Sequence, residues 1–186
     1  MKLETKRLIL RELEQGDQKQ LIEGINNLNI SKWLLVVPYP YNKKDADWWI
    51  KNCIKNYKKK DKETYPLAIE LKEEKKIIGG IGLDDINKFQ GRASVGYWIA
   101  EPYWKKGYAS EALSELLKFA FNKLKLRRIE ANVFVGNPAS GKLLEKFGAK
   151  LEGTLRKASK CKADGKIKED YVYGLLKEEW KPLVGG

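Results

Sequence analysis

The chain has 186 residues, of which 42% are hydrophobic and 33% are charged, and this composition is typical of one globular domain spanning residues 1–186. Its 37 basic residues against 25 acidic residues give a net charge of +12, which favours anionic partners such as nucleic acid, ribosomes, phosphorylated cofactors or acidic membranes. The polar N-terminus MKLETKRLIL and the short apolar runs argue against a signal peptide and a membrane span, so we expect a cytoplasmic protein.

The first third of the chain is predicted to form one strand and two helices. Alternating apolar residues at 7–13 indicate the strand. Asp17 is a suitable N-cap for a helix over about 18–27, and Asp45 begins a second helix over 45–60.

The middle of the chain is predicted to form an antiparallel meander followed by a helix. Apolar segments rich in β-branched or aromatic residues lie at 65–71, 76–83 and 93–100, separated by polar turns. From residue 109 onward, alanine, leucine and phenylalanine recur at steps of three and four residues, which is typical of a helix packed on a sheet.

The last third contains a predicted strand at 128–135, a short helix at 138–147 that Gly148 closes, and two strands around the turn at 163–166. Taken together, the elements predict an α/β domain. It has a mostly antiparallel central sheet of about seven strands, flanked by about four helices.

The loop before the central helix has the features of an anion site. In YWKKGYASEAL at 103–113, a strand is followed by a glycine turn and a helix N-terminus, where free N–H groups and the helix dipole attract anions. Gly107 permits close approach of a ligand, and Lys105 and Lys106 add positive charge. The loop lacks the G-x-x-x-x-G-K-[ST] and G-x-G-x-x-G patterns, so by pattern alone a phosphate site and a surface turn with solvated lysines are equally open.

Four segments in order resemble the GCN5-related N-acetyltransferase (GNAT) superfamily, and more closely the branch that acetylates the N-terminal amines of ribosomal proteins. They are TKRLILREL near the N-terminus, VGYWIAEPYWKKGYASEAL in the middle, VFVGNPASGKLLEKFGAKLEG after it and YGLLKEEW near the end. The resemblance covers residues 5 to about 180. It implies a GNAT-like fold that uses acetyl-CoA as co-substrate and needs no metal.

The resemblance also implies which residues bind acetyl-CoA. The loop equivalent to WKKGYA surrounds the pyrophosphate with its backbone amides, which assigns Lys105, Lys106, Gly107, Tyr108, Ala109 and Ser110 to the cofactor. The backbone of the preceding strand, at Trp98, Ile99 and Ala100, is expected to pair with the pantetheine arm and to hold the thioester carbonyl.

Three residues of the following helix region complete the expected site. Asn137 is expected to contact the pantetheine or the thioester, Ser140 to protonate the leaving thiolate, and Lys142 to reach the outer phosphates. Simpler interpretations stay open as well. Asn137 before Pro138 is a good helix N-cap, Ser140 is a polar residue of the first turn, and Lys142 is a solvated lysine.

The chain departs from this branch at the general base. Members of the branch often carry a glutamate at the position of Ser94, and some carry an acidic residue at the position of Ser159. Glu130 and Asp170 are left as candidates, although each also fits a surface or network role. Histidine is absent and the two cysteines lie far apart, so neither histidine base chemistry nor a Cys/His zinc site is expected.

We therefore expect direct acetyl transfer to a primary amine, with the N-terminal α-amine of a protein such as a ribosomal protein as the preferred acceptor. An α-amine with a pKa of about 7.7 to 8.0 is partly neutral at physiological pH, whereas lysine is about 0.1% neutral, so a site without an identified base suits the α-amine. A small amine such as an antibiotic, a polyamine or a metabolite is the alternative acceptor. From another class, the basic hairpin at 156–168 could bind nucleic acid or contact a ribosome, or the chain could bind CoA without catalysis.

Overall fold

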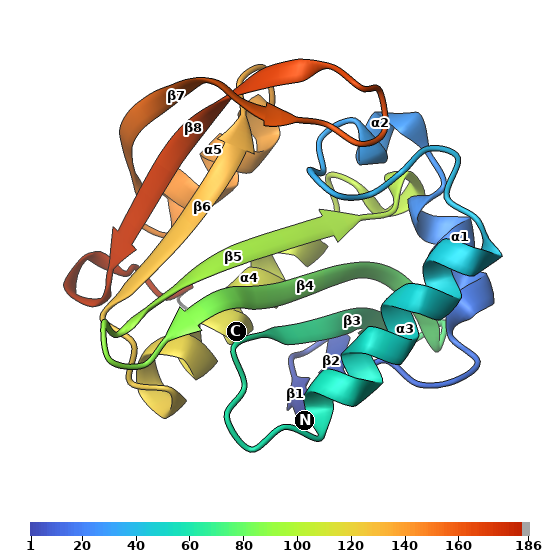
Figure 1. The fold of residues 1–186 in the computed structure, drawn as a ribbon. Helices are drawn as coiled ribbons and strands as arrows, with labels where there is room; N and C mark the ends of the chain where they lie inside the picture. The colour runs from blue at the N-terminus through green and yellow to red at the C-terminus, as the bar shows by residue number, and fades with distance from the viewer. Residues whose placement is uncertain (184–186) are drawn as a thin grey trace.

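One mixed sheet organises the computed structural model, which describes residues 1–183 (Figure 1). Its eight strands lie in the order β1-β2-β3-β4-β5-β6-β8-β7, and every neighbouring pair is antiparallel except β5 and β6. The strands are β1 (Lys2–Glu4), β2 (Leu8–Arg11), β3 (Tyr65–Leu71), β4 (Lys76–Asn87), β5 (Arg92–Ile99), β6 (Arg128–Phe134), β7 (Lys150–Lys160) and β8 (Ile167–Leu176).

Five α-helices accompany the sheet in the part of the chain that the structure describes: α1 (Gln18–Ile25), α2 (Leu28–Ser31), α3 (Lys43–Tyr57), α4 (Tyr108–Lys118) and α5 (Pro138–Lys146). The expected α/β fold with a mostly antiparallel sheet is confirmed. The extra strand and the extra helix relative to the prediction are β1 and α2, which have only three and four residues. Elements this short do not show a hydrophobic period in a sequence.

Helices cover the two faces of the sheet with separate cores. Leu113 and Leu117 of α4 are buried against one face, called here the α4 face. Leu21 of α1 and Ile50 of α3 pack on the opposite face, called here the α3 face. Figure 1 shows α1 and α3 in front of the sheet and α4 behind it.

The side chains of β5 alternate between these two faces. Val95 and Ile99 belong to the core on the α4 face. Because successive residues of a strand point to opposite sides, Ser94, Gly96 and Trp98 point to the α3 face. The contacts of Trp98 with the two cores on that side confirm this assignment.

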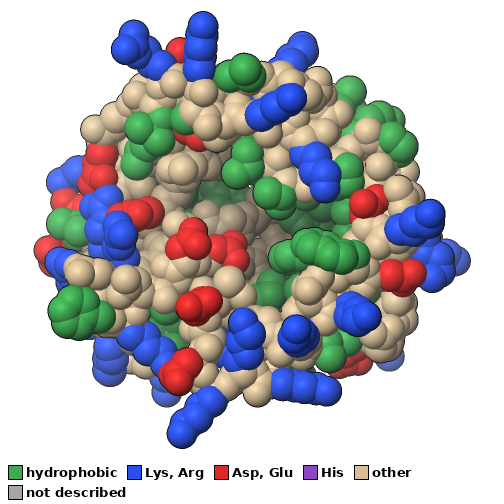
Figure 2. Space-filling view, viewed as in Figure 1, with side chains coloured by type: hydrophobic (Ala, Val, Ile, Leu, Met, Phe, Trp, Pro, Cys, Tyr) green, Lys and Arg blue, Asp and Glu red, His purple; other side chains and the backbone are tan. Residues whose placement is uncertain are grey.

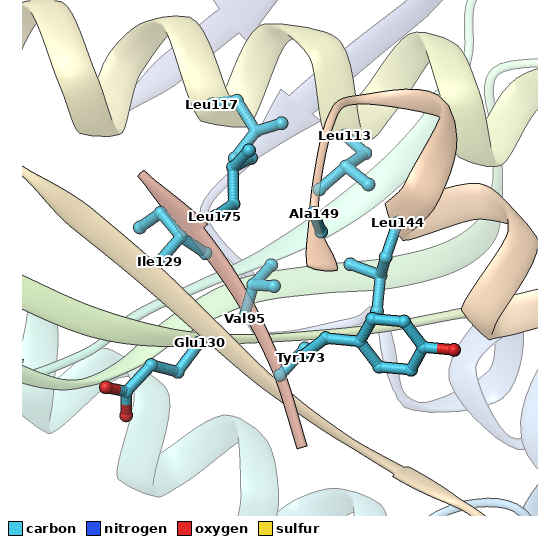
Figure 3. A pocket seen from close by; sticks show the side chains of 10 residues that line it. Val95, Leu113, Leu117, Ile129, Glu130, Leu144, Ala149, Tyr173 and Leu175 are labelled. Atoms are coloured by element: carbon cyan, nitrogen blue, oxygen red, sulfur yellow. The ribbon is translucent and has the colours of Figure 1, made fainter. Parts of the chain in front are cut away.

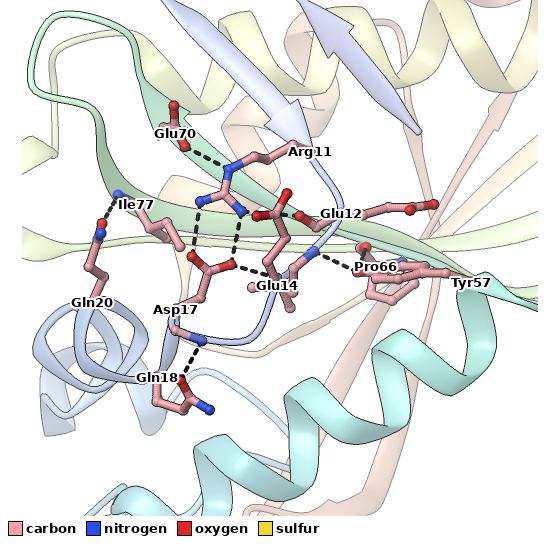
Figure 4. Close-up of polar contacts among 12 residues, drawn as sticks. Arg11, Glu12, Glu14, Asp17, Gln18, Gln20, Tyr57, Pro66, Glu70 and Ile77 are labelled. Atoms are coloured by element: carbon pink, nitrogen blue, oxygen red, sulfur yellow. Dashed lines mark hydrogen bonds and ion pairs between the residues drawn. The ribbon is translucent and has the colours of Figure 1, made fainter.

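Asp17 occupies the predicted N-cap position of α1, but its side chain does not cap the helix. Asp17 has helical backbone angles and makes no side-chain cap bond. Its carboxylate instead accepts hydrogen bonds from Arg11 at 2.8 Å and from the backbone N–H of Glu14 at 2.8 Å, and Arg11 also pairs with Glu70 of β3 at 2.6 Å (Figure 4). A half-buried arginine on β2 therefore competes for the carboxylate, and local sequence does not reveal such a long-range partner.

The starts of α3 and α5 show how local signals define the other helices. Asn42, not Asp45, is the N-cap of α3, and Asp45 is the third helical residue of a capping box with it. The Asn137 side chain accepts a hydrogen bond from the Ser140 N–H at 3.3 Å and Pro138 follows it, so the predicted cap of α5 is confirmed.

Candidate active site

Strands β5 and β6 separate after a short paired segment. Among the strands of residues 1–183 they are the only parallel neighbours, and they pair at three positions, of which Ser94 with Glu130 is the last. Both strands continue beyond this pair, β5 to Ile99 and β6 to Phe134, and Figure 1 shows them diverging. The backbone edge of β5 from Val95 to Ile99 therefore has no sheet partner on the β6 side.

Alternation along β5 decides which backbone groups face this gap. The Ala100 N–H donates to the Ile78 carbonyl on β4 at 2.8 Å. With the antiparallel register of β4 and β5, Trp98 also directs its N–H and C=O to β4, whereas Tyr97 and Ile99 direct theirs toward the gap. Of the three backbone positions expected to meet pantetheine, only Ile99 faces the gap. Tyr97 also faces the gap, although it was not among the expected positions.

The carbonyl of Ile99 already has a partner within the protein. Trp104 donates its indole N–H to this carbonyl at 2.6 Å. This bond holds the start of the loop at 104–107 against the end of β5. The Ile99 N–H, like that of Tyr97, is left as a donor that faces the gap.

The loop before α4 presents an uncapped helix N-terminus. Gly107 is the N-cap with φ +82°, and no side chain caps the helix. The first intrahelical bond runs from the Glu111 N–H to the Gly107 carbonyl at 3.1 Å. Within residues 1–183, the N–H groups of Tyr108, Ala109 and Ser110 have no protein acceptor. The left-handed backbone at Gly107 and the three free donors agree with the predicted anion site.

Lys105 also has a left-handed backbone, with φ +59°. This region favours glycine, so a lysine at this position adopts it at some cost. Lys105 and Lys106 are both exposed and lie directly before Gly107. The loop thus places two cationic side chains beside the free N–H groups.

Arg7 of the segment before β2 anchors this loop, and the sequence analysis missed it. Its guanidinium donates to the Lys106 carbonyl at 3.0 Å, pairs with Glu111 at 2.7 Å and lies 4.4 Å from the centre of the Tyr108 ring. Burial opposes ionisation of Glu111, but hydrogen bonds from Thr5 and Arg7 outweigh it, so the pKa of Glu111 is lowered. The ion pair fixes the first turn of α4 before any ligand binds.

The last turn of α5 reaches the first turn of α4. Lys146 places its Nζ 3.5 Å from the Ser110 Oγ. Lys142 lies one turn earlier on α5 and is exposed. The structure therefore brings a second pair of lysines to the same end of the molecule as Lys105 and Lys106, and Lys146 is the member that the sequence analysis did not identify.

A pair of hydroxyl groups joins β5 to α5. The Tyr97 hydroxyl lies 2.8 Å from the Ser140 Oγ and donates to the Ser140 carbonyl at 3.2 Å. Burial raises the pKa of Tyr97 to about 12, so the phenol is protonated at physiological pH. The predicted acid Ser140 thus has a protonated hydroxyl beside it.

The α4 face next to the paired end of β5 and β6 is closely packed. A cavity of about 10 Å³ there is lined by apolar side chains that include Val95, Leu113 and Leu144 (Figure 3). This volume holds about one water. Figure 3 also shows the carboxylate of Glu130 directed away from these apolar side chains.

The α3 face carries carboxylates beside the missing base position. Ser94 lies between Asp84 of β4 and Glu130 of β6 in the sheet. Glu130 is paired with Arg128 at 2.8 Å and with Arg92 at 3.5 Å. Asp84 is exposed, yet desolvation by the surrounding protein raises its pKa. Figure 2 shows a hollow near the middle of this face with acidic side chains beside it.

Asp170 is the other carboxylate that the sequence analysis left as a candidate. It is 3% exposed, and one of its oxygens accepts from the Ser159 hydroxyl at 2.5 Å. Its other oxygen, Oδ1, has no hydrogen-bond partner in the described part of the chain. Glu130 and Asp170 thus differ sharply, because the first is neutralised by arginines and the second is not.

An open hollow of about 660 Å³ lies between the α1–α2 connection and the turn after β5. Its acidic side chains are already occupied. Glu101 accepts hydrogen bonds from Asn27 and Asn29, and Glu23 pairs with Lys76 at 3.5 Å. The hollow therefore offers no free carboxylate.

Residues 1–183 contain neither a metal-ligand cluster nor a membrane-spanning helix. No group of three or more His, Cys, Asp and Glu side chains there is placed to hold a metal ion. No helix in the same range is long and apolar enough to cross a membrane.

Comparison with known proteins identifies relatives over nearly the whole chain. The family profile described as "Acetyltransferase (GNAT) domain" matches residues 7–150. The chain is 33% identical over 178 residues to "Uncharacterized N-acetyltransferase p20" of Bacillus licheniformis, covering 96% of this chain and 97% of that protein. It is 28% identical over 176 residues to "Putative ribosomal N-acetyltransferase YdaF" of Bacillus subtilis, covering 94% and 93%. Among solved structures, the chain is similar to spermidine N-acetyltransferase from Vibrio cholerae in complex with CoA and spermine, with a TM-score of 0.78, 26% identity, and coverage of 94% of this chain and 98% of that chain.

Proposed function

Because the chain belongs to the GNAT acetyltransferase family, we propose that it transfers the acetyl group of acetyl-CoA directly to the N-terminal α-amine of a protein, such as a ribosomal protein. The single observation that best supports acetyl transfer is the gap between β5 and β6, which ends at the uncapped N-terminus of α4. Family membership sets aside the alternatives of a nucleic-acid-binding module and of a CoA-binding module without catalysis.

The proposed cofactor site extends from the α4 N-terminus into the gap. The pyrophosphate would accept from the N–H groups of Tyr108, Ala109 and Ser110, where the positive end of the helix dipole also lies. Lys105 and Lys106 would add charge from the loop, and Lys142 would add charge from α5. The pantetheine arm would follow the unpaired edge of β5 at Tyr97 and Ile99, with Asn137 near the thioester end.

The proposed chemistry uses groups on both sides of the gap. The neutral amine attacks the thioester carbon, and a C–N bond forms as the C–S bond breaks. The Ile99 N–H faces the gap and is placed to donate to the developing oxyanion. Ser140 gives its proton to the leaving thiolate and recovers one from the adjacent Tyr97 hydroxyl or from solvent.

Replacing Ser140 with alanine should lower kcat about tenfold and change the Kd for acetyl-CoA by less than about twofold. The proton is transferred only as the C–S bond breaks, so its loss affects the transition state more than the ground state. Water can enter in place of the hydroxyl and limits the effect. Steady-state kinetics together with calorimetric binding of acetyl-CoA measure both quantities, and an unchanged kcat would transfer the role to another group.

Three observations bear on the acceptor. The similarity to a relative named for ribosomal N-acetylation favours a protein N-terminus. The similarity to a spermidine N-acetyltransferase favours the alternative, a small amine such as a polyamine. The net charge of +12 repels polycations and so supports the first acceptor over the second. Incubating the protein and acetyl-CoA with N-terminal peptides, polyamines and small amines, followed by mass spectrometry, tests the choice.

Contact with a ribosome, and with it a cytoplasmic location, belongs to the same proposal. The β7–β8 hairpin exposes Arg156, Lys157, Lys160 and Lys166 to solvent. Such a surface attracts the phosphates of RNA, and the attraction weakens with salt as counterions compete. It would offset the repulsion between this basic chain and a basic ribosomal protein.

Replacing Arg156 and Lys160 with glutamate should slow acetylation of a ribosome-bound acceptor several-fold at low salt. Acetylation of a short free peptide should change little, because a peptide makes no phosphate contact. Initial rates for both acceptors between about 50 and 200 mM salt give the comparison. The same loss for the free peptide would place the two side chains in the transfer site and remove the argument for RNA contact.

A further inference from the structure

Asp170 is deeply buried, and one of its two carboxylate oxygens has no hydrogen-bond partner in residues 1–183. Its side chain is 3% exposed, and its Oδ2 accepts from the Ser159 hydroxyl at 2.5 Å. Its Oδ1 is buried without a hydrogen-bond partner in residues 1–183. A buried carboxylate oxygen that lacks a donor is costly, so its retention calls for a partner that the free protein lacks.

The sheet places Asp170 on the α3 face, at the wide end of the gap. Tyr173 and Leu175 of β8 belong to the core on the α4 face, so Asp170 points to the opposite side. Asp170 is the direct neighbour of Phe134 on β6. Phe134 lies four residues beyond the last pair of β5 and β6, which involves Glu130. The unused oxygen thus lies where the two strands have separated.

The β7–β8 hairpin is fixed over this side of the gap. The Lys162 N–H donates to the Leu35 carbonyl at 3.1 Å, and the Cys161 thiol lies 3.6 Å from the Lys32 carbonyl. Figure 1 shows the hairpin turn beside α2. Ser159 and Asp170 are therefore held on an anchored element, which suits a site that must position a small reacting group.

No cationic side chain in the described structure pairs with Asp170. The nearest basic residue on the same face of β8 is Lys168, and its ammonium group is used elsewhere. It donates to the Lys32 carbonyl, pairs with Asp164 at 3.1 Å and lies 4.8 Å from the centre of the Phe134 ring. A protonated amino group from outside the chain would therefore be a suitable partner, because its charge is opposite to that of the carboxylate.

We propose that Asp170 and Ser159 bind the amino group of the acetyl acceptor and take the proton that its nitrogen loses during attack. This inference rests on the proposed acetyl transfer to a primary amine. As the C–N bond forms, the nitrogen passes a proton to the Ser159 Oγ, and the Ser159 hydroxyl proton moves to Asp170 Oδ2. Asp170 later releases this proton to solvent, while Ser140 supplies the separate proton that the thiolate needs.

Replacing Asp170 with asparagine should lower kcat/KM for an amine acceptor about thirtyfold, which is typical for the loss of one hydrogen bond to a charged group. The Kd for acetyl-CoA should stay within about twofold, because the cofactor site lies on the other side of the gap. Ser159→Ala should show a smaller loss in the same direction, since it keeps the carboxylate. Asp61→Asn is the control, because it removes an exposed carboxylate that pairs with Lys88 in the connection between α3 and β3, and it should have little effect.

A rescue variant separates a role at the amine from a merely structural role. Adding Ser159→Glu to the Asp170→Asn protein returns a carboxylate to the same place from the neighbouring strand, and we expect it to recover most of the lost kcat/KM. A purely structural role for Asp170 would not be rescued in this way. Full activity of a folded Asp170→Asn protein, or an equal loss in Asp61→Asn, would overturn the proposal.

Binding of the amine provides a readout that does not depend on turnover. The probe is the peptide Ser-Ala-Gly-Ala-Gly-amide, titrated into the CoA-bound protein by calorimetry, with its N-acetylated twin as control. Wild type should bind the free-amine peptide about tenfold more tightly than Asp170→Asn does, and the twin should show no difference. If wild type binds the amine but acetylates nothing, the proposed function fails while the amine site stands. If both proteins bind the two peptides equally, the amine site fails.

Discussion

Replacing Gly107 with valine should weaken acetyl-CoA binding about a hundredfold. Gly107 has φ +82°, a conformation that a β-branched residue adopts only at a cost of about 1 to 2 kcal/mol or more. The chain can avoid this strain by turning the loop to negative φ. That movement would redirect the free N–H groups of Tyr108 and Ala109, which the phosphates need together. Calorimetric titration with acetyl-CoA measures the loss.

Gly16 provides the matched control for this change. It also has positive φ, at +109°, and a Cβ there would meet no atom within 4 Å. Gly16→Val therefore introduces similar backbone strain in the loop before α1, away from the gap. It should lower thermal stability while leaving the Kd for acetyl-CoA unchanged. A folded Gly107→Val protein with wild-type affinity would show that the loop does not hold the pyrophosphate.

Features that depend on local chemistry could be predicted from the sequence. The β3 strand at 65–71 was predicted with its observed bounds, because both ends carry strong turn signals. The leucine and alanine stripe of α4 and the Asn-Pro start of α5 were also visible. Each of these signals lies within a few residues of the structure it determines. The anion loop before α4 could be proposed for the same reason.

Features that depend on distant partners could not be predicted. Arg7 and Glu111 meet across 104 positions of the chain, and neither is unusual in its own segment. The separation of β5 from β6 follows from how far each strand extends beyond their last shared pair, which no periodicity shows. The direction of the Ile99 and Ala100 backbone groups depends on the register with β4. The residues that face the gap could therefore be assigned only from the register of the strands in the structure.

The choice of a general base among the carboxylates also depends on distant partners that the sequence does not show. Glu130 and Asp170 were equal candidates in the sequence, because each is an acidic residue on a predicted strand. In the structure, Glu130 contacts two arginines, whereas Asp170 has an oxygen without a partner. The difference arises from cross-strand neighbours, which a single sequence does not specify.

An N-terminal α-amine should be acetylated about 300-fold faster than a lysine side chain in the same peptide at neutral pH. The two amines have pKa values near 7.7 to 8.0 and 10.4, so deprotonating lysine costs about 3.5 kcal/mol more. Rates for a peptide with a free α-amine and blocked lysines are compared with those for a twin with a blocked N-terminus and free lysines. Equal or faster acetylation of the N-terminally blocked twin would contradict the α-amine proposal and favour lysine or small-amine chemistry.

The pH profile of kcat/KM gives an independent check of the same acceptor, because the neutral amine is the attacking form. With an α-amine, the rate should rise through about pH 7.5 to 8 and level above the α-amino pKa, as further increase in pH adds little neutral amine. With lysine, the rate should still rise well past about pH 9. Ser140→Ala should lower the whole curve without moving its midpoint, because the midpoint belongs to the acceptor and Ser140 acts on the thiolate. A midpoint that stays fixed when the peptide is replaced by an amine of different pKa would instead assign the titration to a group of the enzyme.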